Sequence, residues 1–368
     1  MGMERFRVVV LGTGFGRNVQ VPAFQRHPGF ELVGIAGSDL ERTRRVAAEL
    51  GIERASADWR GLIETARPHL VSIATPVDLH HPMAMAALEL GAHVLCEKPT
   101  ALDRHQAAEI RDRAAALSRV AAINHEFRFL PARRLALQLV QAGAIGAPRR
   151  AEILGRYATW ATPGTRGMSW LSEKRRGGGM LGALGSHHTD CFRTMFGEPV
   201  SVLASVRVDQ PWRGPTESQK ERARATADDA CTVEYRFERG VTGFIDLDAT
   251  APYRWERFEV RGEEATLRWD ESGYRLWRIA PSKDPEELAI PRELALAPRE
   301  GEPALIAPFS VMVERLYRAL RGESRMEPDF DDAVAVQAAL DAARASSEAG
   351  ARIYIELPSK AAAPVGRV

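Results

Sequence analysis

The chain has 368 residues, 50 Lys and Arg against 49 Asp and Glu, and a formal net charge of +1 at pH 7. This length exceeds one ordinary hydrophobic core, so we expect two domains. The charges are scattered along the chain instead of forming blocks, which argues against a nucleic-acid-binding or membrane-surface protein.

The three cysteines, Cys96, Cys191 and Cys231, are widely separated and follow no metal-ligand spacing. They are typical of inert thiols in a reducing compartment. The first residues lead directly into an apolar strand, and no apolar run approaches the roughly 20 residues of a spanning helix. The sequence therefore indicates a cytoplasmic protein without a metal, a membrane partner or a nucleic-acid partner.

The first third of the chain alternates between short apolar runs and helical patterns. This alternation predicts an α/β fold with a Rossmann-type parallel sheet, the dinucleotide-binding domain, over residues 1–126. The expected strands are residues 6–11, 32–36, 70–74, 94–96 and 120–123, and the expected helices are residues 40–50, 82–90 and 105–117.

After Asn124 the strands alternate between apolar and polar residues, and several are joined by glycine-containing turns. This pattern predicts a C-terminal α+β domain with an open, largely antiparallel sheet over residues 127–358. Residues 209–227 are expected to be a surface excursion and residues 359–368 a flexible tail. The expected strands are residues 151–157, 201–208, 231–237, 242–249, 256–261 and 266–269, and the expected helices are residues 131–142 and 331–349.

A glycine-rich turn follows the first strand. The dinucleotide fingerprint has glycines at its first, third and sixth positions. Here Gly12 and Gly14 match, the sixth position is Arg17, and the additional glycine is Gly16, one position early. Gly12 and Gly14 still allow backbone N–H groups and a helix N-terminus to face a phosphate.

The end of the second strand bears on the choice of cofactor. The position where a carboxylate would hold the adenosine ribose is Gly37, followed by Ser38 and Asp39. Without a carboxylate at 37, a 2′-phosphate is not repelled, and Ser38 with Arg42 could bind it. Alternatively, Asp39 only caps the helix and Arg42 is solvated. We favour NADP and keep NAD open.

Several further motifs follow in a fixed order and spacing, and together with the glycine turn they resemble the Gfo/Idh/MocA family (glucose-fructose oxidoreductase, inositol dehydrogenase, rhizopine catabolism). The resemblance covers nearly the whole chain. In chain order the motifs are Ala74-Thr75-Pro76, His80, Glu97-Lys98-Pro99, residues 124–131, Ala144-Ile145-Gly146 and residues 177–190.

This resemblance implies hydride exchange with a sugar, cyclitol or related carbonyl compound, and it implies that Lys98 is the central catalytic group. The amine of Lys98 would exchange a proton with the substrate oxygen. A surface lysine is the alternative, but ligands of such folds bind at the carboxyl edge of the sheet, where Lys98 is expected. Glu97 could hold the nicotinamide ribose or fix Lys98.

Family members with the full constellation have Asp-x-Gly-x-His in the second domain, and here the Asp position is Ala183. The proton-handling set is thereby reduced to Lys98 and His187. Asp190, three residues after His187, could orient the His187 ring or lie on the helix surface. His188 is a weaker candidate, because neighbouring helical residues diverge by about 100°.

The remaining assignments also rest on this resemblance. His80 could close over the cofactor or be an ordinary packing histidine. The candidate cofactor-binding residues are Gly12, Gly14, Phe15, Gly16, Ser38, Arg42, Thr75, Pro76, His80, Glu97 and Lys98. The candidate substrate-binding residues are Asn124, Arg128, Trp170, His188 and Asp190.

These observations favour an NAD(P)-dependent oxidoreductase that interconverts a secondary hydroxyl and a ketone on a sugar, nucleotide sugar or cyclitol. Two alternatives remain: a cofactor-recycling glycosidase or lyase without net redox, and a non-catalytic NAD(P)-binding sensor. An antiparallel sheet with one apolar face needs a partner surface, so we expect a homodimer or homotetramer.

Overall fold

The computed structural model describes residues 5–162, 164, 166–217, 219–270, 272–296 and 298–356. The chain divides into two compact units: unit 1 comprises Met1–Glu126 and Ala297–Val334, and unit 2 comprises Phe127–Leu296 and Ala335–Leu357. Residues 298–334, which lie within the expected range 127–358, are grouped with unit 1. The expected tail at 359–368 lies outside the described residues.

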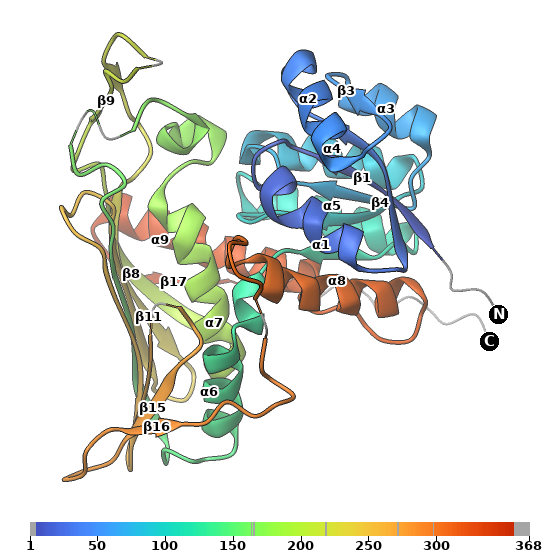
Figure 1. The fold of residues 1–368 in the computed structure, drawn as a ribbon. Helices are drawn as coiled ribbons and strands as arrows, with labels where there is room; N and C mark the ends of the chain where they lie inside the picture. Colours follow the sequence, from blue (N-terminus) through green and yellow to red (C-terminus); the bar gives the residue numbers. More distant parts are fainter. Residues whose placement is uncertain are drawn as a thin grey trace. The chain divides into compact units, whose positions relative to one another are not determined.

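Unit 1 is built on six parallel strands in the order β3-β2-β1-β4-β5-β6, so the predicted Rossmann-type sheet is confirmed (Figure 1). Its elements are β1 (Phe6–Leu11), η1 (Gly16–Gln20), α1 (Val21–Arg26), β2 (Phe30–Ala36), α2 (Leu40–Leu50), β3 (Ala55–Ser56), α3 (Trp59–Ala66), β4 (Leu70–Ile73), η2 (Val77–Leu79), α4 (His80–Glu89), β5 (His93–Cys96), α5 (Arg104–Ala116), β6 (Ala121–Ile123) and α8 (Ile306–Leu320).

The central strands of unit 1 are apolar on both faces. Val8, Val9, Val10 and Leu11 of β1 are completely buried, as are Leu70 and the other residues of β4. Such strands occur where helices cover both sides of a parallel sheet. The sequence predicted these strands well because burial on both faces leaves a continuous apolar run.

Helix α8 belongs to unit 1 because its aromatic residues pack against the first strands of that unit. The Phe309 ring lies 5.9 Å from the Phe24 ring, and the Tyr317 ring lies 5.9 Å from Phe6 and 5.8 Å from Phe30. The sequence analysis did not predict this helix. Its partners are about 280 residues earlier in the chain, so no local pattern points to them.

Unit 2 contains a nine-stranded sheet in the order β16-β15-β14-β13-β7-β12-β11-β8-β17. Only the β7–β12 pair among them is parallel, so the predicted open, largely antiparallel sheet is confirmed for the described residues. The sheet strands are β7 (Pro148–Arg156), β8 (Pro199–Arg207), β11 (Ala230–Phe237), β12 (Thr242–Asp248), β13 (Trp255–Gly262), β14 (Thr266–Trp269), β15 (Leu276–Ile279), β16 (Glu286–Leu288) and β17 (Ile353–Tyr354).

The other elements of unit 2 include a separate two-stranded sheet and the helices that precede and follow the large sheet. Two elements, η3 and α9, contain residues of both units. The elements outside the large sheet are η3 (Glu126–Phe129), α6 (Pro131–Gln141), η4 (Trp170–Ser172), η5 (Lys174–Arg176), η6 (Leu181–Gly185), α7 (Ser186–Phe196), β9 (Trp212–Arg213), β10 (Ala223–Arg224) and α9 (Phe330–Ala349). In the part of the chain that the structure describes, no helix has the length and apolar character needed to cross a bilayer.

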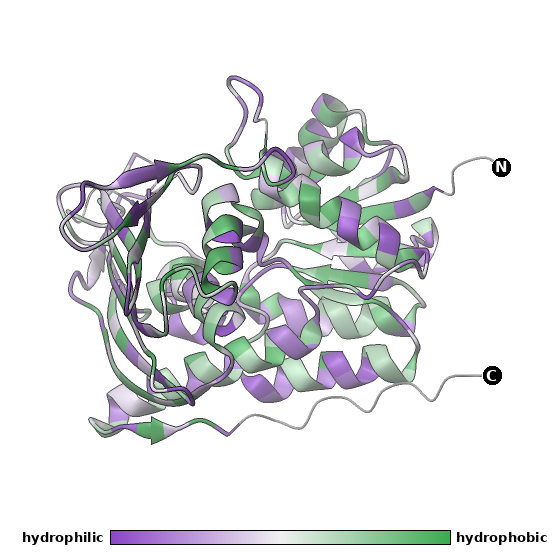
Figure 2. Cartoon of the chain, turned by 90° about the horizontal axis from the view of Figure 1, so that it is seen from below, coloured by the Kyte–Doolittle hydropathy of each residue, from purple (hydrophilic) through white to green (hydrophobic). Residues whose placement is uncertain are grey.

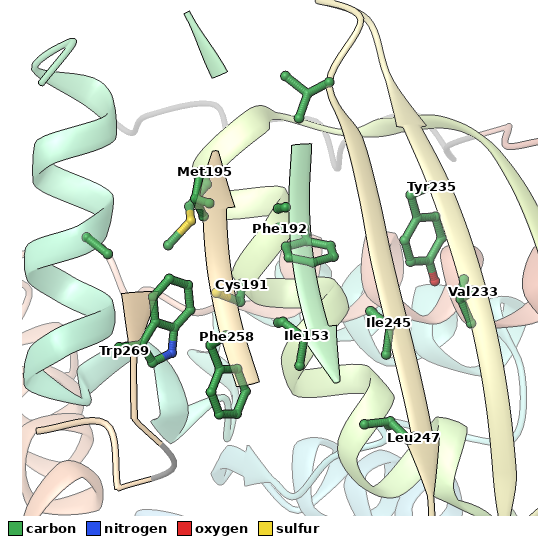
Figure 3. Close-up of a cluster of buried hydrophobic side chains, with 14 of the residues drawn as sticks. Ile153, Cys191, Phe192, Met195, Val233, Tyr235, Ile245, Leu247, Phe258 and Trp269 are labelled. Carbon is green, nitrogen blue, oxygen red and sulfur yellow. The ribbon is translucent and has the colours of Figure 1, made fainter. Parts of the chain in front are cut away.

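The core of unit 2 lies between the large sheet and the helices on one of its faces. Strand β12 alternates between buried and half-buried residues. Figure 2, coloured by hydropathy, shows both green and purple segments along the strands of the large sheet. Cys191, Phe192 and Met195 of α7 pack against Ile153 and Ile245 of the sheet (Figure 3). This packing fixes α7, the helix that carries His187, on the sheet.

The segment 209–227 is more firmly anchored than the expected surface excursion. Arg213 is completely buried, its Nη2 lies 3.1 Å from Oδ2 of the buried Asp229, and its guanidinium lies 4.4 Å from the Trp160 ring. The sequence suggested a loop because Pro, Gly and charged residues dominate the segment. The buried ion pair supplies an anchor that composition does not reveal.

The turn after β1 requires glycine at position 12 for two reasons. Gly12 has φ +121°, and a Cβ there would lie 2.2 Å from the Ala74 backbone oxygen. Gly14, two residues later, has open space around the position of a Cβ. The first glycine therefore permits the close approach of the turn to the end of β4, and the second leaves a face of the turn open.

We expect Gly12→Ala to lower the free energy of unfolding by at least about 2 kcal/mol, because the variant adds backbone strain and a contact with Ala74. Gly14→Ala is the matched control and should change it by less than about 1 kcal/mol. Urea unfolding followed by circular dichroism measures both. Equal effects of the two substitutions would contradict this interpretation of the turn.

Candidate functional site

The glycine turn of unit 1 has the form of a phosphate-binding turn, except that Gly16 takes the role of the glycine usually found at the sixth position. A Cβ at Gly16 would lie 2.9 Å from Val10 Cγ1, so Gly16 allows the following helix to pack closely on β1. In the fingerprint the sixth position does this. Gly14 is exposed and Phe15 is half-buried. The open space at Gly14 fits the approach of a pyrophosphate, which a side chain there would obstruct.

The end of β2 explains why position 37 lacks a carboxylate. A Cβ at Gly37 would lie 2.6 Å from Thr43 Oγ1 and 2.8 Å from Thr13 Cγ2. Asp39 accepts a hydrogen bond from the Arg42 backbone N–H at 2.8 Å and thereby caps α2. The side chains of Ser38 and Arg42 are exposed. Packing thus excludes a side chain at 37 and leaves Ser38 and Arg42 beside that position.

Glu97 is the centre of a buried hydrogen-bond network at the carboxyl end of the parallel sheet. Its Oε1 accepts hydrogen bonds from Gln20 Nε2 at 2.8 Å and from Asn124 Nδ2 at 2.6 Å. Gln20 Oε1 in turn accepts a hydrogen bond from the Ser72 hydroxyl at 2.8 Å. These side chains come from η1, β4 and the segments that follow β5 and β6, so one network connects four neighbouring parts of the sheet edge.

Burial raises the pKa of Glu97, while Lys98 and the two amide donors oppose this shift. Glu97 is 7% exposed, and both of its amide partners, Gln20 and Asn124, are completely buried. The network therefore holds Glu97 in one position and fixes the backbone from which Lys98 projects. Lys98 itself is half-buried.

His80 joins two loops at the same edge of the sheet. Its Nε2 lies 2.9 Å from the Thr75 carbonyl oxygen, and its Nδ1 lies 3.0 Å from the Pro99 carbonyl oxygen. Burial lowers the pKa of His80, although the hydrogen bonds to the carbonyl groups oppose this effect. Both ring nitrogens are thus used inside unit 1. His80 supports the loop that contains Thr75 and Pro76 and the loop that contains Lys98.

Asn124 was expected to contact substrate, and the structure gives it a different place. Its side chain is completely buried in unit 1 and donates to Glu97. An amide fixed in this way acts on the site through Glu97. We therefore do not carry Asn124 into the proposed substrate site.

In unit 2, the glycine run before α7 is closely packed. Gly179 has φ +113°, and a Cβ there would lie 2.0 Å from Asp228 Oδ1. Asp228 Oδ2 accepts a hydrogen bond from the Leu181 backbone N–H at 2.8 Å, at the start of the π-helical segment η6. Ala183, where related motifs have Asp, lies within η6. The run is thus a constrained entry to α7 instead of a plain loop.

His187 lies in the first turn of α7, and its ring stacks on Phe127 with centroids 3.9 Å apart and planes at 9°. Asp190, expected either to orient the His187 ring or to lie on the helix surface, is not exposed. Its carboxylate is buried and pairs with Arg128, at 2.6 Å from Nε and 2.5 Å from Nη2. Two residues expected to meet the substrate therefore engage each other.

His188 and Trp170, also candidate substrate-binding residues, lie in surroundings that differ from each other. His188 is 1% exposed, and its ring lies 5.7 Å from the Phe258 ring on β13. Burial, together with the nearby charge of Arg133, holds its pKa well below the usual value. His188 faces the sheet, as the 100° divergence between neighbours predicts. Trp170 is half-buried in η4, before the glycine run.

The sequence analysis missed Gln20, Ser72 and Asp228. Gln20 and Ser72 support Glu97, and Asp228 holds the start of η6. Gln20 in the helical segment η1 and Ser72 in the apolar strand β4 are buried polar residues, which is a weak signal for a supporting role. Asp228 lies outside the helices and strands and carries no such signal. Their partners lie far away in sequence, so this signal could not have named the contact.

Comparison with known proteins adds to this geometry. A family model described as "Oxidoreductase family, NAD-binding Rossmann fold" matches residues 6–125, and a model described as "GFO/IDH/MocA C-terminal domain" matches residues 134–268. An uncharacterised oxidoreductase of Synechocystis sp. is 27% identical over 91% of this chain and 92% of the relative. The levoglucosan dehydrogenase of Pseudarthrobacter phenanthrenivorans is 29% identical over 72% of this chain and 73% of the relative.

A solved structure of levoglucosan dehydrogenase in complex with NADH and levoglucosan superposes on this chain with a TM-score of 0.86. The two chains are 25% identical, and the alignment covers 96% of this chain and 100% of the other. The structural comparison and the sequence comparison thus both find similarity to levoglucosan dehydrogenase.

The raised pKa of Glu97 predicts a specific pH dependence of stability. The folded state binds the Glu97 proton more tightly than the unfolded state, so this contribution to stability is lost as pH rises through the raised pKa. Glu97→Gln cannot ionise. We expect the free energy of unfolding of Glu97→Gln, relative to wild type, to increase between about pH 4 and about pH 8.

Urea unfolding at a series of pH values measures this difference. Glu49→Gln, which removes an exposed carboxylate paired with Arg17, is the control and should show a smaller pH dependence. A difference for Glu97→Gln that stays constant or falls with pH would show that the carboxyl group is not held as described.

Proposed function

Because the chain belongs to the GFO/IDH/MocA family of NAD-binding oxidoreductases, we propose that it interconverts a secondary hydroxyl and a ketone on a sugar, nucleotide sugar or cyclitol. The family and the named relatives support an NAD(P)-dependent enzyme of the dehydrogenase or reductase type. The similarity to levoglucosan dehydrogenase supports a carbohydrate as the substrate class. The identity of the carbohydrate and the favoured direction are not part of the proposal.

The observation that carries this function is the fixed position of Lys98 in unit 1. Lys98 directly follows Glu97, whose carboxylate is held by Gln20 and Asn124. Gln20 also belongs to η1, the segment that starts within the glycine turn. The same network therefore holds the end of η1, next to the glycine turn, and the backbone from which Lys98 projects, which supports a joint role for the turn and the lysine.

The site residues fit a nicotinamide dinucleotide. Gly12 and Gly14 would present backbone N–H groups to the pyrophosphate, and Ser38 with Arg42 would lie at the adenosine ribose. Thr75 and Pro76 would line the path of the cofactor, with His80 behind them. The bound cofactor supplies the hydride chemistry.

The proton is handled by the protein in this proposal. Lys98 takes the hydroxyl proton from the substrate during oxidation and returns it to the carbonyl oxygen during reduction. We assign His187 of unit 2 the second proton-handling role, as a hydrogen-bonding group. The stack on Phe127 fixes the plane of the His187 ring, which favours a directional interaction over a mobile one.

A non-catalytic sensor is the second candidate, and Ala183 is the observation that favours it, because the carboxylate of the full constellation is absent there. A sensor binds the dinucleotide without oxidising or reducing a substrate. Absorbance of the reduced nicotinamide over a panel of sugars and cyclitols separates the two. A glycosidase or lyase without net redox would show product formation without a lasting change in this absorbance.

We expect Lys98→Met to abolish turnover while dinucleotide affinity stays within a few fold. The methionine side chain is similar in length to that of lysine but lacks the amine. His187→Ala should lower kcat by ~10²–10⁴-fold. Lys174→Met, which removes an exposed lysine paired with Glu348, is the control and should keep wild-type activity. Steady-state kinetics and fluorescence titration measure these quantities. A fully active Lys98→Met enzyme would overturn the mechanism.

The surroundings of Gly37 predict the cofactor preference. NADPH should bind at least as tightly as NADH, and Arg42→Ala should weaken NADPH binding by about tenfold, equivalent to about 1.4 kcal/mol. NADH binding should change little. Arg45→Ala on the same helix is the control. Fluorescence titration of the four combinations gives the result, and a strong preference of wild type for NADH would instead indicate Asp39 as the ribose ligand.

The outward face of the large sheet supports a proposed homodimer or homotetramer. Leu203 is 40% exposed and Tyr354 is 79% exposed on neighbouring strands β8 and β17 of this face. Light scattering should give a mass that is a multiple of 40.6 kDa. The Leu203→Arg and Tyr354→Arg double variant should shift the mass toward the monomer. A wild-type monomer at working concentrations would remove this proposal.

A further inference from the structure

The candidate catalytic residue His187 shares an aromatic neighbour with a buried cation. Phe127 stacks on the His187 ring with centroids 3.9 Å apart, and the Arg133 guanidinium carbon lies 5.0 Å from the centre of the same Phe127 ring. The guanidinium carbon is therefore at most about 9 Å from the centre of the His187 ring. Charges at such a distance interact appreciably inside a protein, because little water lies between them.

Arg133 keeps its charge in the interior of unit 2. It is 5% exposed, and a guanidinium group stays protonated inside proteins. The rings of Phe127 and Phe258, at 5.0 and 5.2 Å from the guanidinium carbon, offset part of the cost of burial. The Nε and Nη1 atoms of Arg133 are buried and have no hydrogen-bond partner among the described residues. The rings thus reduce the cost of burying Arg133 without cancelling its positive charge.

The carboxylate beside His187 is already neutralised. Asp190 lines the same small cavity as His187, Arg128 and Arg133. The two oxygens of Asp190 accept hydrogen bonds from Arg128, at 2.6 Å from Nε and 2.5 Å from Nη2. Because these two charges cancel, Asp190 does not offset the charge of Arg133.

The other titratable groups of α7 add no net charge. Burial, together with the charge of Arg133, holds the pKa of His188 well below its usual value, so its ring is neutral. Burial raises the pKa of the Cys191 thiol, which also stays neutral. Arg193 Nη2 is paired with Glu198 Oε1 at 2.5 Å. Arg133 therefore remains as a positive charge without a counter-charge among these groups.

This excess charge disfavours the protonated form of His187. Protonation would place a second positive charge near Arg133 in an environment with little screening, whereas a neutral imidazole avoids the repulsion. A side chain that only filled the space between Phe127 and Phe258 would be apolar, since burying unpartnered donors costs free energy. The charge of Arg133, and not its packing alone, therefore accounts for an arginine at this position.

We propose that Arg133 is a positioning residue of the candidate site and that its charge keeps the His187 imidazole neutral. In the proposed function, on which this assignment rests, His187 is a hydrogen-bonding group and the amine of Lys98 exchanges the proton. A neutral imidazole has one N–H donor and one acceptor nitrogen. It can therefore form a hydrogen bond without competing for the proton that Lys98 exchanges.

The test is an NMR titration of the His187 ring in the full-length protein without substrate, with the signals assigned from His187→Gln. In wild type His187 should take up its proton at a lower pH than the exposed His105. Arg133→Met, which keeps a similar length and removes the charge, should move the His187 titration to higher pH. Arg133→Lys keeps a positive charge and should titrate close to wild type.

Arg134→Met is the matched control. It removes the same charge from the next position of α6, where the side chain diverges from that of Arg133 by about 100°. Its His187 titration should stay close to that of wild type. A shift in Arg134→Met as large as that in Arg133→Met would show that the effect is not specific to Arg133 and would overturn the proposal.

The pH profile of kcat separates the charge of Arg133 from a merely structural role. Arg133→Met should lose about tenfold in kcat near pH 6 and stay within about threefold of wild type near pH 9, where His187 is neutral in both proteins. Arg133→Lys should restore the activity near pH 6. A structural role would instead lower kcat by a similar factor at every pH and would not be rescued by lysine.

A His187 titration that Arg133→Met leaves unchanged, or that Arg133→Lys shifts equally, would overturn the proposal. Because Arg133→Met could fail to fold, a second measurement uses wild type alone. Raising NaCl from about 0.05 M to about 0.5 M should leave the His187 titration in place, since a buried charge is screened little. A large salt dependence would show that surface charges control His187 and would also overturn the proposal.

The NMR titration needs no turnover, so it separates this inference from the proposed function. A protein without turnover whose His187 titration shifts as expected in Arg133→Met would support the effect of Arg133 and overturn only the proposed function. An active enzyme whose His187 is already protonated in wild type above the pH at which His105 titrates would overturn the effect of Arg133 and leave the proposed function standing.

Discussion

The buried carboxyl group of Glu97 is the constraint on which the candidate site depends. A carboxyl group removed from water is costly unless hydrogen bonds compensate it. Gln20 and Asn124 supply these bonds, and Gln20 is itself fixed by Ser72. These hydrogen bonds form only if η1, β4 and the residues that follow β5 and β6 lie next to one another at one edge of the sheet. The network therefore gives Lys98 a position determined by the whole of that edge.

Unit 2 also buries charged side chains beside helix α7. Arg128 and Asp190 neutralise each other while buried, and Arg133 is held between Phe127 and Phe258. The His187 ring stacks on the same Phe127. Phe127 thus contacts both the ring of the candidate catalytic residue His187 and the guanidinium group of Arg133.

The sequence predicted most of the regular elements but not all of their partners. Helix α2 was predicted over its full observed length, Leu40–Leu50, because Asp39 and Gly51 mark its ends. Strands β1 and β14 were also predicted with their observed bounds. Helix α8 was missed, since its role is visible only in its contacts with aromatic residues near the start of the chain.

By itself, the sequence determined the class of fold, the glycine turn, and the positions of Lys98 and His187 in their motifs. These features depend on periodicity and spacing, which are properties of neighbouring residues. Only the tertiary structure decided that Glu97 pairs with a residue 77 positions away and that Asp190 pairs with one 62 positions away. A buried polar group takes the partner that the packing brings within hydrogen-bonding distance, and the order of residues along the chain does not specify that partner.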